Sequence, residues 1–100
     1  MQKSGKSHKP VVWTEQARKD LEKIFDHIAD NFSIELAIRK TEQIFNEVES
    51  LGQFPRKGSI SQRFNEIREL IVEGNTIYYR NNETDIVIAS VRARKTAPKS

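Results

Sequence analysis

The side chains best suited to chemistry lie in the second half of the chain. Glu69 can accept a proton and Tyr78 can donate one. Cleavage of a phosphodiester without a metal needs such a pair together with cations at the phosphate. A structural role is also open to each of these side chains. Glu69 could pair with Arg80 across neighbouring strands, a surface contact worth well under about 1 kcal/mol, and tyrosines are common in strands whatever the function. The cations available are Arg68, Arg80, Arg92, Arg94 and Lys95.

Metal and cofactor chemistry has little basis in the sequence. There is no cysteine, which excludes disulfides and thiolate metal sites. The two histidines are His8, near the N-terminus, and His27, inside a predicted helix. Neither is placed for acid and base work beside the arginines. We therefore expect no metal and no cofactor.

Length and composition predict one compact domain. The chain has 100 residues, of which 36% are hydrophobic and 31% are charged, as in soluble globular proteins. No stretch approaches the roughly 20 apolar residues that a membrane helix needs, and no apolar run follows the first lysines as in a signal peptide. We expect a cytoplasmic protein without a membrane partner.

The basic excess is confined to the two ends of the chain. Residues 1–14 carry three lysines and residues 91–100 carry four basic side chains, with no acid in either stretch, whereas the net charge of the whole chain is only +3. Such ends are usually solvated. We predict a flexible basic N-terminal tail over residues 1–9, a folded domain over 10–95 and a C-terminal tail over 96–100.

Two apolar stripes predict a helical hairpin behind a short leading strand at residues 11–13. Thr14 and Ser33 are suited to cap the two helices, and Gly52 is suited to end the second. The first stripe comprises Ala17, Leu21, Ile24 and Ile28, flanked by Phe25 and Phe32. The second comprises Ala37, Thr41, Ile44, Val48 and Leu51, widened by Ile34, Ile38 and Phe45.

The pattern then changes to that of strands. Residues 53–65 read as a loop, and apolar runs at 66–72, 75–80 and 85–91 are joined by turn residues. Sequential strands with short connections form an antiparallel meander. The order β-α-α-β-β-β predicts an α+β two-layer sandwich, in which an antiparallel helical hairpin packs on one face of a mainly antiparallel sheet of three or four strands.

Strand alternation separates a helix-facing side from an open side of the sheet. With a two-residue turn after Val72, the helix side receives Arg68, Leu70, Val72, Ile77 and Tyr79. The open side receives Ile67, Glu69, Ile71, Thr76, Tyr78 and Arg80. In the last strand the apolar alternation breaks after Ile88 and resumes at Val91, which predicts a bulge near Ala89 and Ser90. Such a bulge would turn Arg92 and Arg94 toward the open side, beside Arg80, as the rim of a basic concavity.

Three segments also stand in a characteristic order: "VVWTEQARKDLEKIFDHIAD", "LGQFPRKG" and "IRELIVEGNTIYYR", the last followed by "DIVIASVRARKTAP". Over roughly residues 10–98 they resemble the RelE/ParE superfamily of toxins from bacterial type II toxin–antitoxin systems, of the plasmid stabilisation type. The resemblance implies a small toxin neutralised by a cognate antitoxin whose C-terminal segment wraps it. RelE-like members cut mRNA in the ribosomal A site, whereas ParE-like members poison DNA gyrase.

Departures from the ribonuclease pattern favour the ParE-like branch. RelE-like sequences carry an arginine three residues before the tyrosine that closes the third strand, and here that residue is Thr76. Lysines of the second strand correspond to about Ile67 and Glu69, which cannot replace them. Arg94 matches the arginine that follows the last strand, but no terminal tyrosine or histidine follows it.

The resemblance leaves three functions to compare. The first is a gyrase poison, with the antitoxin bound across the hairpin and the sheet and with the five cations as target or antitoxin contacts. The second is a ribosome-dependent mRNA endoribonuclease with a shifted site, in which Glu69 is the base, Tyr78 the proton donor, and Arg68, Arg80, Arg92 and Arg94 surround the phosphate. The third is a member that only binds its antitoxin and meets operator DNA only through that complex.

Overall fold

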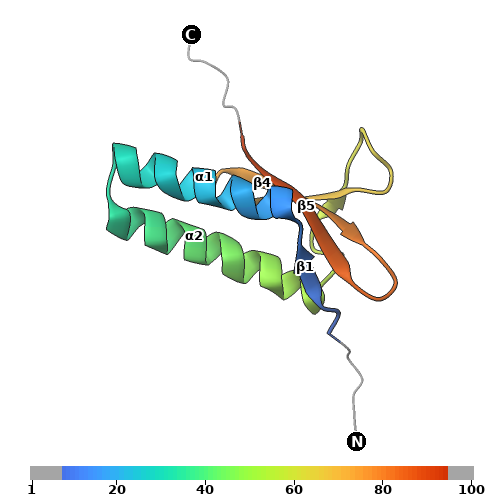
Figure 1. Cartoon of the computed structure of the whole chain (residues 1–100). Coiled ribbons are helices and arrows are strands. Elements are labelled where there is room, and N and C mark those ends of the chain that lie inside the picture. The colour runs from blue at the N-terminus through green and yellow to red at the C-terminus, as the bar shows by residue number, and fades with distance from the viewer. Residues whose placement is uncertain (1–7, 95–100) are drawn as a thin grey trace, which may run out of the picture.

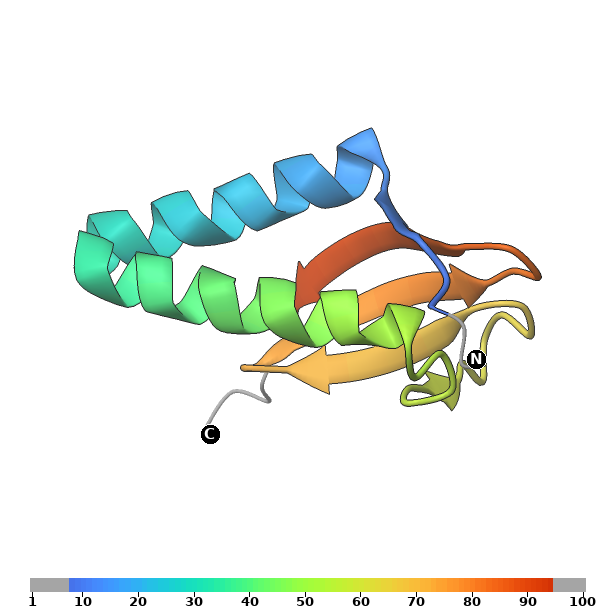
Figure 2. The same cartoon turned by 90° about the horizontal axis from the view of Figure 1, so that it is seen from below.

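The computed structural model describes residues 8–94 and has the predicted two layers. Two antiparallel helices lie over one face of a five-stranded sheet, and the other face of the sheet has no helix above it (Figures 1 and 2). The closed end of the helical hairpin extends past the end of the sheet in both views. The α+β architecture predicted from the sequence is therefore confirmed.

The two helices begin at the predicted caps. Helix α1 spans Glu15–Asn31, and the Thr14 hydroxyl accepts the backbone N–H of Ala17 at 3.1 Å. Helix α2 spans Ile34–Glu49, and the Ser33 hydroxyl accepts the N–H of Leu36 at 3.0 Å. Each hydroxyl satisfies one of the N–H groups that a helix leaves unpaired in its first turn.

The end of the second helix differs from the prediction. Helix α2 continues into a 3-10 turn, η1, over Ser50–Gly52. Gly52 does not end the helix through a left-handed conformation, since Gly74 is the one glycine with positive φ among residues 8–94. It is needed for space instead, because a Cβ at this position would lie 2.5 Å from the Lys9 carbonyl oxygen.

The sheet has the order β1-β5-β4-β3-β2. Strand β1, Val11–Trp13, pairs in parallel with β5, and the other neighbours are antiparallel. The turn between β3 and β4 has positive φ at Glu73 and Gly74, as in the two-residue turns that favour hairpins. The remaining strands are β2, Ser59–Ile60, β3, Arg68–Val72, β4, Asn75–Asn81, and β5, Ile86–Ala93.

Strand β2 corrects the prediction that residues 53–65 are loop throughout and that the sheet has at most four strands. It contains two residues only, and its place is fixed by pairing of Ser59 with Glu69 and of Ile60 with Arg68. A strand this short has no alternation that a sequence pattern could reveal.

The core lies between the helices and the sheet, as the alternation predicted. Tyr79 and Ile44 are its largest fully buried side chains. Phe32 is 70% exposed and Ile34 is 59% exposed, although both were expected to widen the apolar stripes. They lie at the closed end of the hairpin, where α1 ends and α2 begins. The cluster of buried apolar residues is Ala17, Ile44, Val48, Leu51, Val72, Ile77, Tyr79, Ile86, Ile88 and Val91.

The predicted bulge is confirmed in β5. Tyr78 pairs with Ser90, but the next residue, Tyr79, pairs with Ile88, so Ala89 is the extra residue. The bulge lets Ile88 and Val91 both face the core although three positions separate them. As a consequence Ser90 and residue 92 face the open side of the sheet.

The predicted tails fall mostly outside the described residues. The structure does not describe residues 1–7 or residues 95–100, which include Lys95. Lys9, expected to belong to a flexible tail, is instead joined to the domain. Its backbone N–H donates to the Gly52 carbonyl at 2.9 Å, and its Nζ donates to Asn81 Oδ1 and to the Asn82 carbonyl, both at 2.8 Å.

Candidate functional site

The open face of the sheet carries a hollow of about 390 Å³. Glu69, Tyr78 and Ser90 form a row across β3, β4 and β5, because Tyr78 pairs with both of the others. Side chains directly opposite one another on neighbouring strands have Cβ atoms about 5 Å apart. The hollow is lined by this row together with Arg63, Phe64, Ile67 and Arg92.

One wall of this hollow is the loop between β2 and β3. The Ser61 hydroxyl accepts the backbone N–H groups of Arg63 and Phe64, at 3.1 and 3.2 Å, which turns the loop tightly. The Ser61 N–H donates to the Ile67 carbonyl at 2.8 Å and closes the loop. The tip presents Phe64, 56% exposed, with the Arg63 guanidinium carbon 5.9 Å from the ring centre. The sequence predicted a loop here but did not single out Arg63 or Phe64, because they lie outside any periodic segment.

The structure does not gather the four predicted arginines around one point. Arg68 lies on the helix side, as its alternation predicted, and its guanidinium donates to the Gly58 carbonyl at 2.6 Å. It therefore cannot share a phosphate with Tyr78 on the opposite face. Arg80 is opposite Val87, whereas Arg92 is opposite Thr76. Positions 76 and 80 are separated by four residue steps along β4, which is roughly 13 Å, so the prediction that Arg92 stands beside Arg80 is wrong.

Arg80 is further occupied by a surface ion pair. Its guanidinium lies 3.3 Å from Glu66, and the two side chains are 48% and 77% exposed. Such an exposed pair contributes about 0–1 kcal/mol. The pairing of Arg80 with Glu69, expected as a structural alternative, does not occur, because Glu69 stands opposite Tyr78. Arg80 does form a structural ion pair, but its partner is Glu66 from the loop between β2 and β3.

The remaining predicted positions are placed as follows. Thr76 is on the open side but only 8% exposed, because its short side chain lies between its two cross-strand neighbours, Ile71 and Arg92. Arg94 follows β5, exposed, and its backbone N–H donates to the Gly74 carbonyl at 2.9 Å. Lys95 lies outside the described residues. The structure thus brings Glu69, Tyr78 and Arg92 together at one hollow.

A second hollow, which we call the hairpin groove, lies between the two helices and β1. Its volume is about 580 Å³, and its walls are mostly apolar. Trp13 lines it and is stacked on Phe45 of α2 with the ring centres 5.9 Å apart, and its indole donates to Glu49 at 3.1 Å. The groove is lined by Val11, Trp13, Arg18, Leu21, Glu22, Phe25, Thr41 and Phe45.

Two buried polar contacts hold these faces in place, and neither was predicted. The Asp20 carboxylate, 7% exposed, accepts the backbone N–H of Val91 at 3.0 Å and the Gln16 amide at 2.8 Å. It joins α1 to the part of β5 that carries Ser90 and Arg92. In the sequence Asp20 is indistinguishable from the exposed acids of the same helix.

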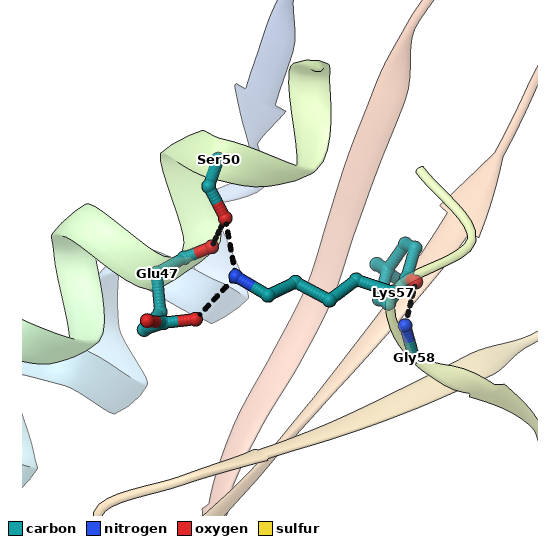
Figure 3. A network of polar contacts seen from close by, with 5 residues as sticks. Glu47, Ser50, Lys57 and Gly58 are labelled. Atoms are coloured by element: carbon teal, nitrogen blue, oxygen red, sulfur yellow. Dashed lines mark hydrogen bonds and ion pairs between the residues drawn. The ribbon is translucent and has the colours of Figure 1, made fainter. Parts of the chain in front are cut away.

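The second contact fixes the loop after α2. The Tyr79 hydroxyl donates to the Pro55 carbonyl at 2.8 Å and accepts the Gly58 N–H at 2.9 Å. Burial raises the pKa of this phenol, although the Gly58 hydrogen bond and nearby Arg68 partly oppose the shift. Lys57 extends the network outward to Glu47 at 2.7 Å and Ser50 at 3.0 Å (Figure 3). In the segment "LGQFPRKG" Lys57 takes part in this network through its side chain, whereas Pro55 and Gly58 contribute backbone groups only.

A model of one protein family matches residues 11–98 and therefore nearly the whole domain. The family is described as the ParE toxin of the type II toxin–antitoxin system parDE. This chain belongs to the ParE toxin family. The resemblance to the wider RelE/ParE superfamily, nearer its ParE-like branch, is thereby confirmed.

Solved structures place this ParE-family chain among known toxin folds. A chain of the chromosomal ParDE system from P. aeruginosa is 25% identical with a TM-score of 0.78, and the match covers 87% of this chain and 98% of that one. A chain of the RelBE2 complex from Mycobacterium tuberculosis is 20% identical with a TM-score of 0.67, covering 92% and 98%. The YoeB dimer from Staphylococcus aureus supplies a chain 14% identical with a TM-score of 0.57, covering 89% and 100%. A search of the curated proteins found no match.

The open-face hollow and the hairpin groove of this ParE-family chain differ in the kind of ligand that they can bind. The open-face hollow combines a carboxylate, a phenol and guanidinium groups, which are able to bind an anion or to move a proton. The hairpin groove is apolar and suits a protein segment. Neither helix in the part of the chain that the structure describes has the length and apolarity to cross a bilayer.

Proposed function

We propose that this chain is a toxin that arrests bacterial growth by poisoning DNA gyrase in the cytoplasm. The observation that supports this most is the composition of the open face. The positions at which the resemblance would place catalytic cations hold Ile67, Glu69 and Thr76, an apolar, an acidic and a nearly buried side chain. Without those cations a phosphate in this hollow would face Glu69 with only Arg63 and Arg92 to offset its charge.

We further propose that a cognate antitoxin neutralises the toxin by covering the hairpin groove. Exposed apolar side chains along one side of α2, Ile34, Ile38 and Phe45, are 59%, 45% and 46% exposed. They recur at helical spacing and continue the groove toward the closed end of the hairpin. Apolar surface of this kind on a small protein indicates a partner. In this proposal operator DNA is met only by the complex of both proteins.

The gyrase proposal is tested with purified toxin in two reactions run side by side. In the first, gyrase supercoils a relaxed plasmid, and we expect the toxin to trap linear, cleaved DNA. In the second, ribosomes translate an mRNA in a reconstituted system, and we expect primer extension to show an intact message. New cleavage sites that appear only with ribosomes would reject the gyrase proposal.

A ribosome-dependent ribonuclease is the second candidate, and one observation favours it. Glu69, Tyr78 and Arg92 line a single hollow on the open face, which supplies a proton acceptor, a proton donor and one cation. Arg63, which no sequence pattern suggested, adds a second cation. A protein inert in both reactions that still binds its antitoxin would instead be the third candidate, an antitoxin-binding member without a target.

A further inference from the structure

The open-face hollow is built in two levels. Its floor is largely polar, with a carboxylate and two hydroxyls in one row across three strands, and its rim carries an aromatic ring and two guanidinium groups. Its volume of about 390 Å³ lies within the range of roughly 300–1,000 Å³ that is usual for small-molecule sites. The partly buried floor consists of Ile67, Glu69, Tyr78 and Ser90, and the exposed rim consists of Arg63, Phe64 and Arg92.

The polar side chains of this hollow have hydrogen-bonding capacity that the fold does not use. Within residues 8–94, no hydrogen bond and no ion pair joins the side chain of Glu69, Tyr78 or Arg92 to another residue. By contrast Arg68 and Tyr79, on the helix side of the same strands, both donate to backbone carbonyls. Polar groups that converge on a concave site without protein partners are those that orient a ligand.

The mixture of charges in the hollow excludes the simplest ligands. A bare anion held by Arg63 and Arg92 would meet the Glu69 carboxylate, and a bare cation held by Glu69 would meet the two guanidinium groups. The ligand must therefore present N–H donors to the floor and negative charge to the rim. Phe64, 56% exposed at the rim, adds a flat apolar face on which a planar ring can stack. A nucleotide has all three features.

The carboxylate on the floor selects among the bases. Guanine presents two adjacent donors on its Watson–Crick edge, the ring N–H and the amino group, which one carboxylate accepts together. Adenine and cytosine place a ring nitrogen acceptor beside the amino group, and uracil places a carbonyl on each side of its N–H, so these edges repel a carboxylate. The guanine carbonyl then needs a donor, which the hydroxyl of Tyr78, directly opposite Glu69, is able to provide.

The surroundings of the hollow favour a free nucleotide over a nucleic-acid strand. A strand requires a basic track for its successive phosphates. Along β4 the next cation is Arg80, whose guanidinium already lies 3.3 Å from Glu66. On β3 the open face presents Ile71, which is apolar and 54% exposed, and Arg94 follows β5 without lining the hollow. The two cations of the rim match the phosphate of a single nucleotide.

We propose that the open-face hollow binds a free guanine mononucleotide, with the base stacked on Phe64, its Watson–Crick edge at Glu69 and its phosphate at Arg63 and Arg92. This binding activity goes beyond the proposed growth arrest and does not rest on it, since the gyrase proposal gives Glu69 no role. It also accounts for the presence of a carboxylate between two arginines, which a phosphate site alone leaves unexplained.

Calorimetric titration of the full-length toxin with the 5′-mononucleotides tests the proposal. We expect GMP to bind at least about tenfold more tightly than AMP, CMP or UMP, which is the discrimination that one bidentate contact provides. Guanosine should bind more weakly than GMP, because it lacks the phosphate. NMR then locates the ligand: the amide resonances of Glu69, Tyr78 and Ser90 should shift, and that of Trp13 in the hairpin groove should not.

Several other outcomes would each overturn the proposal. Equal affinity for all the bases means that the hollow does not read the Watson–Crick edge. Absence of GMP binding at millimolar concentration rejects the site, and shifts confined to the hairpin groove reject its location. If a short strand of thymidines with one central guanosine binds about tenfold more tightly than GMP, the ligand is a strand and not a free nucleotide. Each result is independent of the gyrase reaction, so failure of this proposal is distinguishable from failure of the proposed function.

Glu69→Gln gives an independent readout through base preference. The glutamine amide donates from its nitrogen and accepts at its oxygen, a pattern that matches adenine and not guanine. The variant should therefore prefer AMP to GMP, a reversal that a merely structural role of Glu69 would not produce. A folded variant that still prefers GMP would contradict the assigned contact.

Two phenylalanines of nearly equal exposure form a matched pair for the stacking contact. Phe64→Ala should weaken GMP binding about tenfold, because base stacking on an aromatic ring is lost. Phe54, 54% exposed in the loop after α2, lies outside the hollow, so Phe54→Ala should leave the affinity unchanged. Equal affinities of the two variants would remove Phe64 from the site. Circular dichroism confirms that each variant is folded.

Discussion

The Asp20 carboxylate accepts the backbone N–H of Val91, a residue 71 positions further along the chain, at 3.0 Å. It satisfies a buried donor on the stretch of β5 that β1 does not reach. This one contact ties the first helix to the strand segment that presents Ser90 and Arg92 on the open face.

We therefore expect Asp20→Ala to lower the free energy of unfolding by about 1–3 kcal/mol, because it leaves the Val91 N–H buried without an acceptor. Asp20→Asn should cost less, since one amide oxygen can still accept that bond. Asp26→Ala, at an exposed acid of the same helix, is the control and should change stability by less than about 0.5 kcal/mol. Urea unfolding measures all three, and a cost for Asp20→Ala no larger than the control would contradict this role.

Stability should also fall at alkaline pH through Tyr79. Burial raises the pKa of its phenol above the ordinary value of 10.0, so the folded protein keeps a proton that the unfolded chain releases. The contribution is fully present below pH 10 and is lost as the pH rises toward the folded pKa. Thermal unfolding between pH 9 and about pH 11 tests this. Tyr79→Phe should remove this part of the pH dependence, and a pH dependence identical to that of the native protein would exclude Tyr79 as the group.

Gly58 should tolerate no side chain. A Cβ there would lie 2.6 Å from the Glu69 carbonyl oxygen and 2.8 Å from the Tyr79 hydroxyl. Gly58→Ala should therefore cost about 1–3 kcal/mol or more, as overpacking of a rigid site does. Gly74→Ala is the comparison: nothing lies within 4 Å, and the cost of about 1 kcal/mol comes from its φ of 78°. If Gly74→Ala lowered the denaturant midpoint more than Gly58→Ala does, the close approach of Glu69 and Tyr79 to Gly58 would be refuted.

Growth arrest should survive loss of the proton donor and acceptor on the open face. Glu69→Gln combined with Tyr78→Phe keeps the shape of the hollow and removes both functions. Under the gyrase proposal, induction of this variant still stops growth. Ile44→Asp is the control, because it places a charge at a fully buried position and should unfold the protein. Its induction should no longer stop growth, which shows that the assay detects loss of the toxin. Loss of toxicity in the folded double variant would favour the ribonuclease.

The sequence predicted those features that depend on local pattern. Thr14 and Ser33 were found because caps have a characteristic chemistry, and the bulge at Ala89 because three apolar residues broke a period of two. The faces of β3 and β4 followed from alternation. These signals are local, so one segment of the chain suffices to read them.

What the sequence missed depends on contacts between distant segments. Asp20 meets Val91, Gly52 makes room for Lys9, and Arg68 donates to Gly58, and no periodicity encodes such pairs. The same holds for the candidate site. Its row of Glu69 and Tyr78 could be predicted from register, whereas the wall formed by Arg63 and Phe64 comes from an irregular loop.

The parallel pairing of β1 with β5 has a consequence for the order of folding. Val11 pairs with Ile86, so the first described strand finds its neighbour only in the last one. Until the ribosome has synthesised residues 86–93, β1 has no partner strand, Asp20 lacks the Val91 N–H, and one edge of β4 is open. Contacts this far apart in sequence also slow folding. The five-stranded sheet therefore cannot be completed before β5 has been synthesised, and the open-face hollow, which Ser90 and Arg92 of β5 help to line, cannot form earlier.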